Sequence, residues 1–533
     1  MLFRSQQLGL TLKNKNLLTQ AQITIGNNIS CSLTYNCRYD SKFTIDLPVT
    51  NNTAEDFIAR TAKSYDIRFY IDGNEYYIKS GTININVGSG NLNVSVTSGT
   101  FSILNSGSLV SPNNPFPITF SGNLVAITYA DTPVIDAFGR LRVSSPYTLF
   151  DDQNNYGADG LIFNYATNGS GSYSSLLNES AVNLTVDGNN NDLCVRQTKQ
   201  YFRYQPGKSQ LIMQTFVLGV AKEGVRKRIG YFDSYNGLFL EQIVSDVEGE
   251  TGLRLVVRTN TSGSPVDTAY DSSTWNLDKM DGFGPSGVDL HAYNAQILFI
   301  DLEWLGVGRV RFGFVVDGNI YYCHEVKNAN NIASVYMRTA DLPVRAEIQN
   351  TSAGNADSLK VICTSVNSEG GFNKLGQPFG IGNGANFKTV TTRQPVLSIK
   401  PNTTFNTLTN RMEYNITDIT VFSQSNTAYY EVVYNGSLNS GNFTPVASGY
   451  SSMTYDVNST LISGGVVIAT GYAVAGGPGE NAIGSDAAAL VKLPLTVNYD
   501  ATNADVLTVV ATCTAESPKT SVVGAVFNWQ EIK

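Results

Sequence analysis

The sequence predicts an all-β protein made of several antiparallel β-sandwich or jelly-roll domains. Charged residues make up only 15% of the chain, well below the usual quarter, while Tyr (28) and Phe (25) far outnumber Met (6). This composition favours pleated strands and turns over long helices. In addition, short strand-like runs follow one another without room for crossover helices. A length of 533 residues predicts roughly three to four domains.

Residues 1–80 predict a small α+β domain, which we expect to anchor or assemble the protein. The run DIRFYIDGNEYYI at 66–78 reads as two strands joined by Asp72-Gly73, a strong tight-hairpin signal. Before it, 53–65 predicts a helix with Thr53 as its cap. This helix is expected to cover one side of a small sheet.

Residues 81–130 alternate apolar and small polar residues, as in TININVGSGNLNVSV. Each predicted strand offers one thin apolar stripe, and a lone hairpin of this kind is marginal in water. Three intertwined copies could bury these stripes, so we expect a neck within a homotrimer. The alternative is a flexible Ser/Gly-rich linker.

The remaining chain predicts two larger domains and a connector. Strand-like runs such as QLIMQTFVL and AQILFIDLEW recur through 131–350 and indicate a large β-sandwich of jelly-roll type. Residues 351–390 are rich in Gly and Asn and predict a long connector. A second sandwich follows at 391–533, and its closing run AVFNWQEI is expected to lie within the sheet.

The formal net charge of −8 opposes binding to nucleic acid and to anionic membranes. No apolar run approaches the ~18 residues of a membrane span, so we expect no membrane insertion. The first 20 residues lack a signal-peptide h-region, which indicates synthesis in a cytoplasm. The widely spaced cysteines are expected to be reduced and mostly buried: Cys31, Cys37, Cys194, Cys323, Cys363 and Cys513.

Histidine limits the possible catalytic chemistry, because the chain has only His291 and His324. Nucleophilic triads and most catalytic zinc sites need a histidine. His291 lies in a Gly/Pro turn, and His324 follows Cys323 on a predicted strand, where neighbouring side chains point to opposite faces. We therefore expect structural roles for both, no enzymatic activity, and no cofactor. The DGNNND run at 187–192 predicts a hairpin loop and no metal site.

Two pairs of charges flank the LGVG turn. Asp301 and Glu303 share one strand face, and Arg309 and Arg311 share another just across the turn. If the hairpin carries a bulge, these four residues form a cross-strand ion-pair ladder. The alternative is a catalytic carboxylate pair of the glycosidase type.

Exposed aromatic side chains could stack on sugar rings, although buried ones serve as core residues. The candidates for glycan contact are Trp275, Trp304 and Trp529.

Four stretches of the sequence are long and distinctive: DAFGRLRVSSPYTLFD, RYQPGKSQ, KRIGYFD and FIDLEWLGVGRVRFGF, which begin at residues 136, 203, 227 and 299. Together they resemble a family of large virion structural proteins from tailed bacteriophages and some large DNA viruses. The resemblance covers 131–350 well and the C-terminal domain more loosely. It implies a fibre, spike or capsid-surface protein of the virion, assembled in the host cytoplasm, and it supplies no catalytic residue.

The resemblance also implies partners, namely other virion proteins and, as a further candidate, host-surface glycans. Two alternatives to a projecting structural protein stay open. One is a tailspike-like enzyme that degrades polysaccharide, and the other is a minor capsid protein that forms part of the shell.

Overall fold

The computed structural model describes residues 146–244, 252–373, 376–475 and 493–533 in full, and before residue 146 only the backbone of nine strands. The chain divides into two units, Met1–Thr132 and Pro133–Lys533. Among the described residues, the helical segments are two 3-10 turns, Leu177–Glu179 and Ser272–Thr274. No helix in the described part is long and apolar enough to cross a membrane. The all-β prediction is therefore confirmed.

The first unit contains one seven-stranded sheet in the order β2-β3-β8-β7-β6-β5, with β9 on β7, and a separate pair formed by β1 and β4. The Asp72-Gly73 hairpin is confirmed, because Ile71 and Asn74 are register partners on either side of it. The strands are β1 (Leu12–Lys13), β2 (Gln20–Ile25), β3 (Ile29–Thr34), β4 (Tyr39–Asp40), β5 (Ile45–Asp46), β6 (Lys63–Ile71), β7 (Asn74–Gly88), β8 (Asn91–Ser98) and β9 (Ser102–Asn105).

Two predictions for this unit need correction. Strand β6 begins at Lys63, so the expected helix does not reach Tyr65, and its remainder at 53–62 lies outside the described residues. The alternating segment does form strands, but β7 runs unbroken across the expected boundary at residue 80 and pairs with both β6 and β8. The backbone of these strands is thus paired within one sheet of one chain, so the strands up to Asn105 do not form a separate neck domain, and 106–130 lie outside the described residues.

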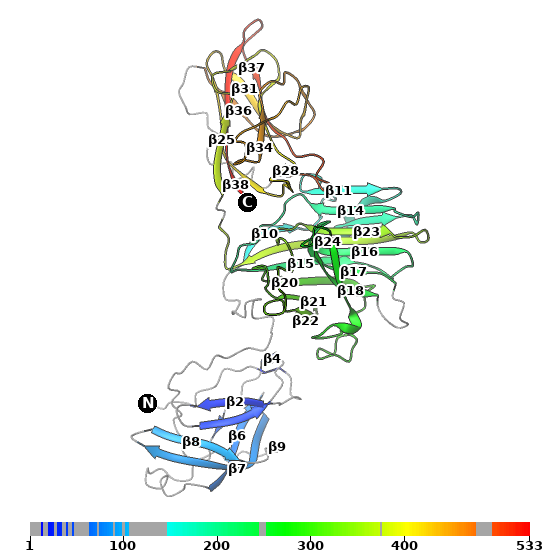
Figure 1. Cartoon of the computed structure of the whole chain (residues 1–533), viewed down its shortest axis with the longest axis vertical. Coiled ribbons are helices and arrows are strands. Elements are labelled where there is room, and N and C mark those ends of the chain that lie inside the picture. The colour runs from blue at the N-terminus through cyan, green and yellow to red at the C-terminus, as the bar shows by residue number, and fades with distance from the viewer. Residues whose placement is uncertain are drawn as a thin grey trace. The chain divides into compact units, whose positions relative to one another are not determined.

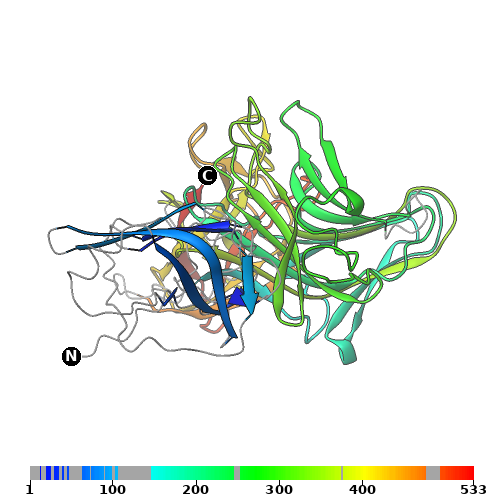
Figure 2. The same cartoon turned by 90° about the horizontal axis from the view of Figure 1, so that it is seen from below.

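In the second unit, residues 147–369 form a sandwich of two antiparallel sheets, here called the first sandwich (Figures 1 and 2). Its β15 sheet has the order β12-β13-β24-β15-β20-β21-β22, with β10 also on β24. These strands are β10 (Tyr147–Asp152), β12 (Ser172–Leu176), β13 (Ala181–Val186), β15 (Ser209–Val217), β20 (Ala295–Leu302), β21 (Val310–Val316), β22 (Asn319–Val326) and β24 (Asp357–Glu369).

The facing sheet, called the β16 sheet, has the order β11-β14-β23-β16-β17-β18-β19. These strands are β11 (Phe163–Asn168), β14 (Leu193–Thr198), β16 (Val225–Phe232), β17 (Gly237–Gln242), β18 (Leu253–Thr259), β19 (Val266–Asp271) and β23 (Val344–Asn350). Alternate residues of both sheets point inward and form one core, including Ile229, Leu240, Ile300 and Phe312, all buried. The intervening residues therefore occupy the outer faces, and charged side chains such as Arg228 and Glu241 lie there.

The predicted connector at 351–390 is wrong for most of its length. Strand β24 spans 13 residues and pairs with β10, β13 and β15, and its Leu359, Val361 and Val366 are buried in the core of the first sandwich. The segment that connects the two sandwiches is the short stretch after β24, and a side chain of the first sandwich contacts its beginning. Lys208 Nζ donates to the Gly371 carbonyl at 2.8 Å.

Residues 377–532 form the second sandwich. One sheet has the order β33-β34-β27-β37-β31-β36, and the other is centred on β38, which pairs with β25, β26 and β30. The final strand thus lies within a sheet, as predicted. The strands of these two sheets are β25 (Gln377–Gly382), β26 (Lys388–Val390), β27 (Gln394–Pro401), β30 (Glu413–Ser423), β31 (Ala428–Tyr434), β33 (Thr444–Pro445), β34 (Met453–Asp456), β36 (Val466–Ala473), β37 (Leu507–Cys513) and β38 (Ser521–Ile532). Two short pairs, β28 (Thr404–Phe405) with β29 (Leu408–Thr409) and β32 (Ser437–Leu438) with β35 (Ile462–Ser463), lie outside them.

Candidate functional site

The outer face of the β16 sheet carries a row of alternating charges, here called the charge ladder. Strand register places Glu347 opposite Arg228, Arg228 opposite Glu241, Glu241 opposite Arg254, and Arg254 opposite Asp271. These five residues come from five neighbouring strands. Directly opposed residues in an antiparallel sheet share a face, so each charge meets the opposite charge on the next strand.

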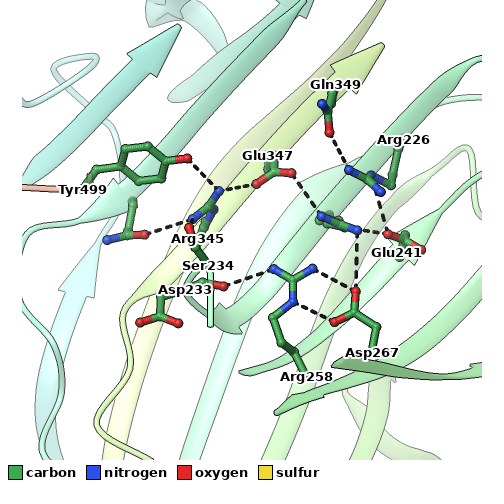
Figure 3. A network of polar contacts seen from close by, with 12 residues as sticks. Arg226, Asp233, Ser234, Glu241, Arg258, Asp267, Arg345, Glu347, Gln349 and Tyr499 are labelled. Carbon is green, nitrogen blue, oxygen red and sulfur yellow. Dashed lines mark hydrogen bonds and ion pairs between the residues drawn. The ribbon is translucent and has the colours of Figure 1, made fainter. Parts of the chain in front are cut away.

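Figure 3 shows part of the ladder, with Glu241 and Glu347 labelled. Arg228 Nε donates to Glu241 Oε2 at 2.5 Å, and its Nη1 donates to Glu347 Oε1 at 3.3 Å. Arg254 also donates to Glu241, and Arg226 Nε lies 3.9 Å from the same carboxylate. The Glu241 carboxylate thus contacts three guanidiniums while its side chain is only 2% exposed. A carboxylate this deeply buried is stable in its charged form only with such partners.

Two further ion pairs extend the ladder on the same face. Arg258 donates two hydrogen bonds to Asp267 in a bidentate arrangement, from Nε to Oδ1 at 2.7 Å and from Nη2 to Oδ2 at 2.8 Å. Arg345 donates to Glu347, two residues along β23. Planar guanidiniums suit this paired geometry better than lysines do.

A pair of aromatic rings lies beneath the arginines. Phe232 and Phe239 are fully buried with ring centroids 4.4 Å apart. The guanidinium carbons of Arg228 and Arg258 lie 5.4 and 5.1 Å from the Phe239 centroid, within cation–π range. Gly230 permits this packing, because a Cβ at that position would lie 2.6 Å from the Phe239 Cβ. The charges are therefore positioned by rigid apolar contacts as well as by one another.

The pKa values show which protonation states this face holds. Burial alone would raise the pKa of Glu347, but the guanidiniums of Arg345 and Arg228 lower it to about 2. Burial likewise opposes ionisation of Asp267, yet Arg258 lowers the pKa of its carboxyl below the ordinary value. General acids at neutral pH need a raised pKa. Both carboxyls are instead held ionised, which suits structural ion pairs.

Arg345 also connects the ladder to the second sandwich. Its Nη2 donates to the Tyr499 hydroxyl at 3.4 Å, and its guanidinium carbon lies 4.8 Å from the Tyr499 ring centroid. Nearby, Lys199 Nζ lies 3.7 Å from Asp505 Oδ1 and donates to the Tyr434 hydroxyl. Charged side chains of the first sandwich therefore meet hydroxyls and a carboxylate of the second.

Arg411 of the second sandwich makes the reciprocal contact. Its guanidinium donates to the carbonyls of Val497, Asn498 and Tyr499 at 2.7, 2.8 and 3.1 Å, which holds one loop in shape. The same group lies 4.6 Å from the ring centroid of Tyr201 in the first sandwich. One side chain thus orders the loop and packs it against the neighbouring sandwich.

The predicted ion-pair ladder across the LGVG turn is confirmed for Asp301 and Arg311. They are register partners on β20 and β21, and they form an ion pair with both side chains fully buried. Asp301 also accepts hydrogen bonds from Ser209 Oγ at 2.8 Å and from the Tyr322 hydroxyl at 3.0 Å. The register is regular here, so the expected bulge is not needed.

Glu303 and Arg309 lie just beyond the strand ends. The Arg309 backbone N–H donates to Glu303 Oε1 at 3.0 Å, and the Arg309 guanidinium lies 3.6 Å from Glu325 on β22. The charge row therefore extends to a third strand. Asp301 is fully buried, so it does not form an exposed carboxylate pair with Glu303 in this structure.

The tryptophan prediction is wrong for two of its three residues. Trp275 (4% exposed) and Trp529 (1%) lie in the two cores, because each ring fills space between sheets. Trp304 is partly buried, its Nε1 donates to the Met337 carbonyl at 3.2 Å, and it packs edge-on against Tyr204. Neither buried ring has a face available to a sugar.

The two histidines occupy different environments. His324 is buried beside Tyr270, its Nδ1 accepts the Asn276 backbone N–H at 3.2 Å, and burial lowers its pKa to about 4. His291 is exposed and stacks on Tyr293.

The described residues contain no group of three or more His, Cys, Asp or Glu side chains arranged to hold a metal ion. The free cysteines in this part of the chain are buried or half-buried: Cys194, Cys323, Cys363 and Cys513. Cys31 lies on β3, of which only the backbone is described, and Cys37 lies outside the described residues.

Sequence reasoning missed the charge ladder, although a signal for it exists. Arg226 and Arg228, like Arg345 and Glu347, are two residues apart in strand-like runs, which places each pair on one face. The spacing does not reveal which strands pair, so the partners could not be assigned.

No protein-family model and no curated protein matches this sequence. Among solved structures, a peanut lectin with a bound nonapeptide is 11% identical, covering 42% of this chain and 98% of that chain, with a TM-score of 0.27. A Bacillus licheniformis β-glucanase is 9% identical, with coverages of 42% and 98% and a TM-score of 0.26. A glycosyl hydrolase family protein from Mycobacterium fortuitum is 7% identical, with coverages of 41% and 99% and a TM-score of 0.30. The similarity concerns the sandwich fold alone.

Proposed function

We propose that this chain is a structural component of a virus particle, of fibre, spike or capsid-surface type, acting through protein–protein assembly and host-surface contact. The observation that carries the proposal is how the charges of the virion-like motifs are used. Asp301 and Arg311 of one motif form a fully buried pair, and Arg228 of another lies in the charge ladder. These residues hold strands together, as expected of a building block.

The free energy lost when a buried ion pair is broken also supports a structural role. Burying paired charges contributes little net stability, but removing one partner of a buried pair costs about 3–5 kcal/mol. A complete network therefore disfavours every strand register except the one that pairs all its members. We infer that the first sandwich is selected for one rigid shape, which repeated assembly contacts require.

The proposal includes the expected partners and location. The chain is a homotrimer in the virion, it is assembled in the host cytoplasm, and it contacts other virion proteins and host-surface glycans. The net charge of −8 supports a role that does not involve nucleic acid.

The test is localisation in purified particles. After density-gradient purification, mass spectrometry should find the chain in fixed stoichiometry with other virion proteins, and antibody labelling in the electron microscope should place it on the particle surface. Labelling within the shell lattice would indicate the minor-capsid alternative. Recovery only from the soluble lysate contradicts the proposal.

Two further measurements test its parts. Light scattering on the purified chain should give a trimer mass, and a monomer mass would remove the trimer while leaving the location intact. Cleavage of host polysaccharide that Asp301→Asn and Glu303→Gln both abolish, with folding retained, would support the enzymatic alternative and contradict the structural proposal.

A further inference from the structure

A tightly bonded loop lies between β19 and β20 of the first sandwich, at residues 278–294, here called the Phe283 loop. Asp278 organises it from within: Oδ1 accepts the Met280 N–H at 2.9 Å, and Oδ2 accepts the Ser286 N–H at 2.6 Å. The Gly282 N–H also donates to the Val288 carbonyl at 3.0 Å. The loop therefore has a fixed backbone shape.

The base of the loop is anchored in the core. Met280, Leu290 and Ala292 are 3, 5 and 9% exposed and belong to the core of the first sandwich. The Leu290 N–H donates to the Met280 carbonyl at 2.9 Å, which closes the base. Trp275, just before the loop, lies in the same core. Because the loop is already ordered, binding a ligand there costs little additional conformational entropy.

The loop presents aromatic rings to solvent. Phe283 is 95% exposed, although burying its ring would stabilise the fold by roughly 1.5–3 kcal/mol. Tyr293 is 54% exposed, and the His291 ring stacks on it with centroids 5.6 Å apart. A single exposed apolar side chain is ordinary in a soluble protein. Here, however, exposed rings stand on a rigid, core-anchored support.

The charged groups of the same loop narrow the class of ligand. Asp281 and Asp289 are both exposed and lie opposite each other in a β-bridge within the loop. Lys279 is the exposed cation of the loop, so carboxylates outnumber ammonium groups there. Carboxylates accept hydrogen bonds from hydroxyl groups and repel anions, while aromatic faces pack against apolar C–H surfaces.

From this combination we propose that the Phe283 loop binds a neutral glycan. The Phe283 and Tyr293 rings stack on C–H faces of pyranose units, and Asp281 and Asp289 accept hydrogen bonds from sugar hydroxyls. The Phe283 loop would thus make the glycan contact that the sequence had suggested for Trp275 and Trp529, which are buried. The inference rests on the host-surface part of the proposed function and assigns it a site and a ligand class.

The test uses the full chain on an array of neutral and acidic oligosaccharides. Wild type should bind at least one neutral oligosaccharide, with little dependence on salt. Phe283→Ala should weaken that binding about tenfold, which corresponds to roughly 1.4 kcal/mol of lost stacking. Tyr293→Ala should weaken it as well. Both side chains are exposed, so thermal unfolding should stay at the wild-type temperature.

Tyr156→Ala is the matched control, because Tyr156 is 99% exposed and lies outside the loop. It should bind as wild type does. Three results overturn the inference: no binding to the array, equal binding by Phe283→Ala, or binding to acidic members alone that salt abolishes. A chain found in particles that binds no neutral glycan refutes this inference only. A chain that binds glycan through Phe283 but is absent from particles refutes the virion proposal only.

Discussion

Asp301 and Arg311 face each other across the β20–β21 hairpin as an ion pair with both side chains fully withdrawn from water. The pair lies on the outer face of its sheet, where a soluble sandwich ordinarily presents solvated groups. Its burial makes each charge dependent on the other.

Breaking the buried pair should be costly. Arg311→Met removes the guanidinium that forms an ion pair with the buried Asp301 carboxylate and should lower the free energy of unfolding by about 3–5 kcal/mol, measured by urea denaturation. Replacing both residues with apolar ones should recover much of this loss. Arg393→Gln is the control, because Arg393 and Glu431 form a more exposed pair, worth at most about 1 kcal/mol. Equal losses for Arg311→Met and Arg393→Gln would show that the buried pair has no special role.

Acid should weaken the charge ladder through Glu347. Its pKa is about 2 in the folded chain against an ordinary value of 4.5, so the folded state binds this proton less readily. The resulting stabilisation is present above pH 4.5 and is lost as the pH falls toward 2. It amounts to about 3 kcal/mol at most. Glu347→Gln should flatten the dependence of stability on pH in this window, whereas Glu516→Gln, at an exposed site, should not. An unchanged profile in Glu347→Gln would contradict the assignment.

His324 should make the fold sensitive to mild acid. Burial lowers its pKa from 6.5 to about 4, so the unfolded chain takes up the proton first. The contribution of neutral His324 to the free energy of unfolding is fully present above pH 6.5 and is lost as the pH drops toward 4. At pH 5 the loss is about 2 kcal/mol. His324→Asn should reduce the difference in unfolding free energy between pH 7.5 and pH 5. The exposed His291→Asn serves as control, and it should behave as wild type.

Arg411 should hold the junction between the two sandwiches. Arg411→Ala removes three hydrogen bonds to carbonyls and the contact with Tyr201. Charged hydrogen bonds contribute about 1.5–3 kcal/mol each, so backbone amides at 496–505 should exchange hydrogen markedly faster. Lys400→Ala is the control, because its contact with Asn503 in the same loop is exposed. Equal exchange in both variants would show that Arg411 does not order the loop.

The sequence alone determined the features that depend on local spacing. The β-rich composition, the Asp72-Gly73 hairpin and the terminal strand were predicted correctly. The Asp301–Arg311 pair belongs to the predicted ladder, but it forms in a regular register, without the bulge on which that prediction depended. Such features follow from period-2 alternation and turn chemistry within about a dozen residues.

The tertiary structure alone decided the rest. Alternation shows which residues share a face, but not which strands become neighbours or which face is covered. Glu347 and Arg228 are far apart in the sequence and meet only because β23 lies beside β16. For the same reason, β24 became a central strand and not a connector, and Trp275 and Trp529 became core residues. The free energy that fixes those arrangements comes from packing between distant segments, which a single strand does not encode.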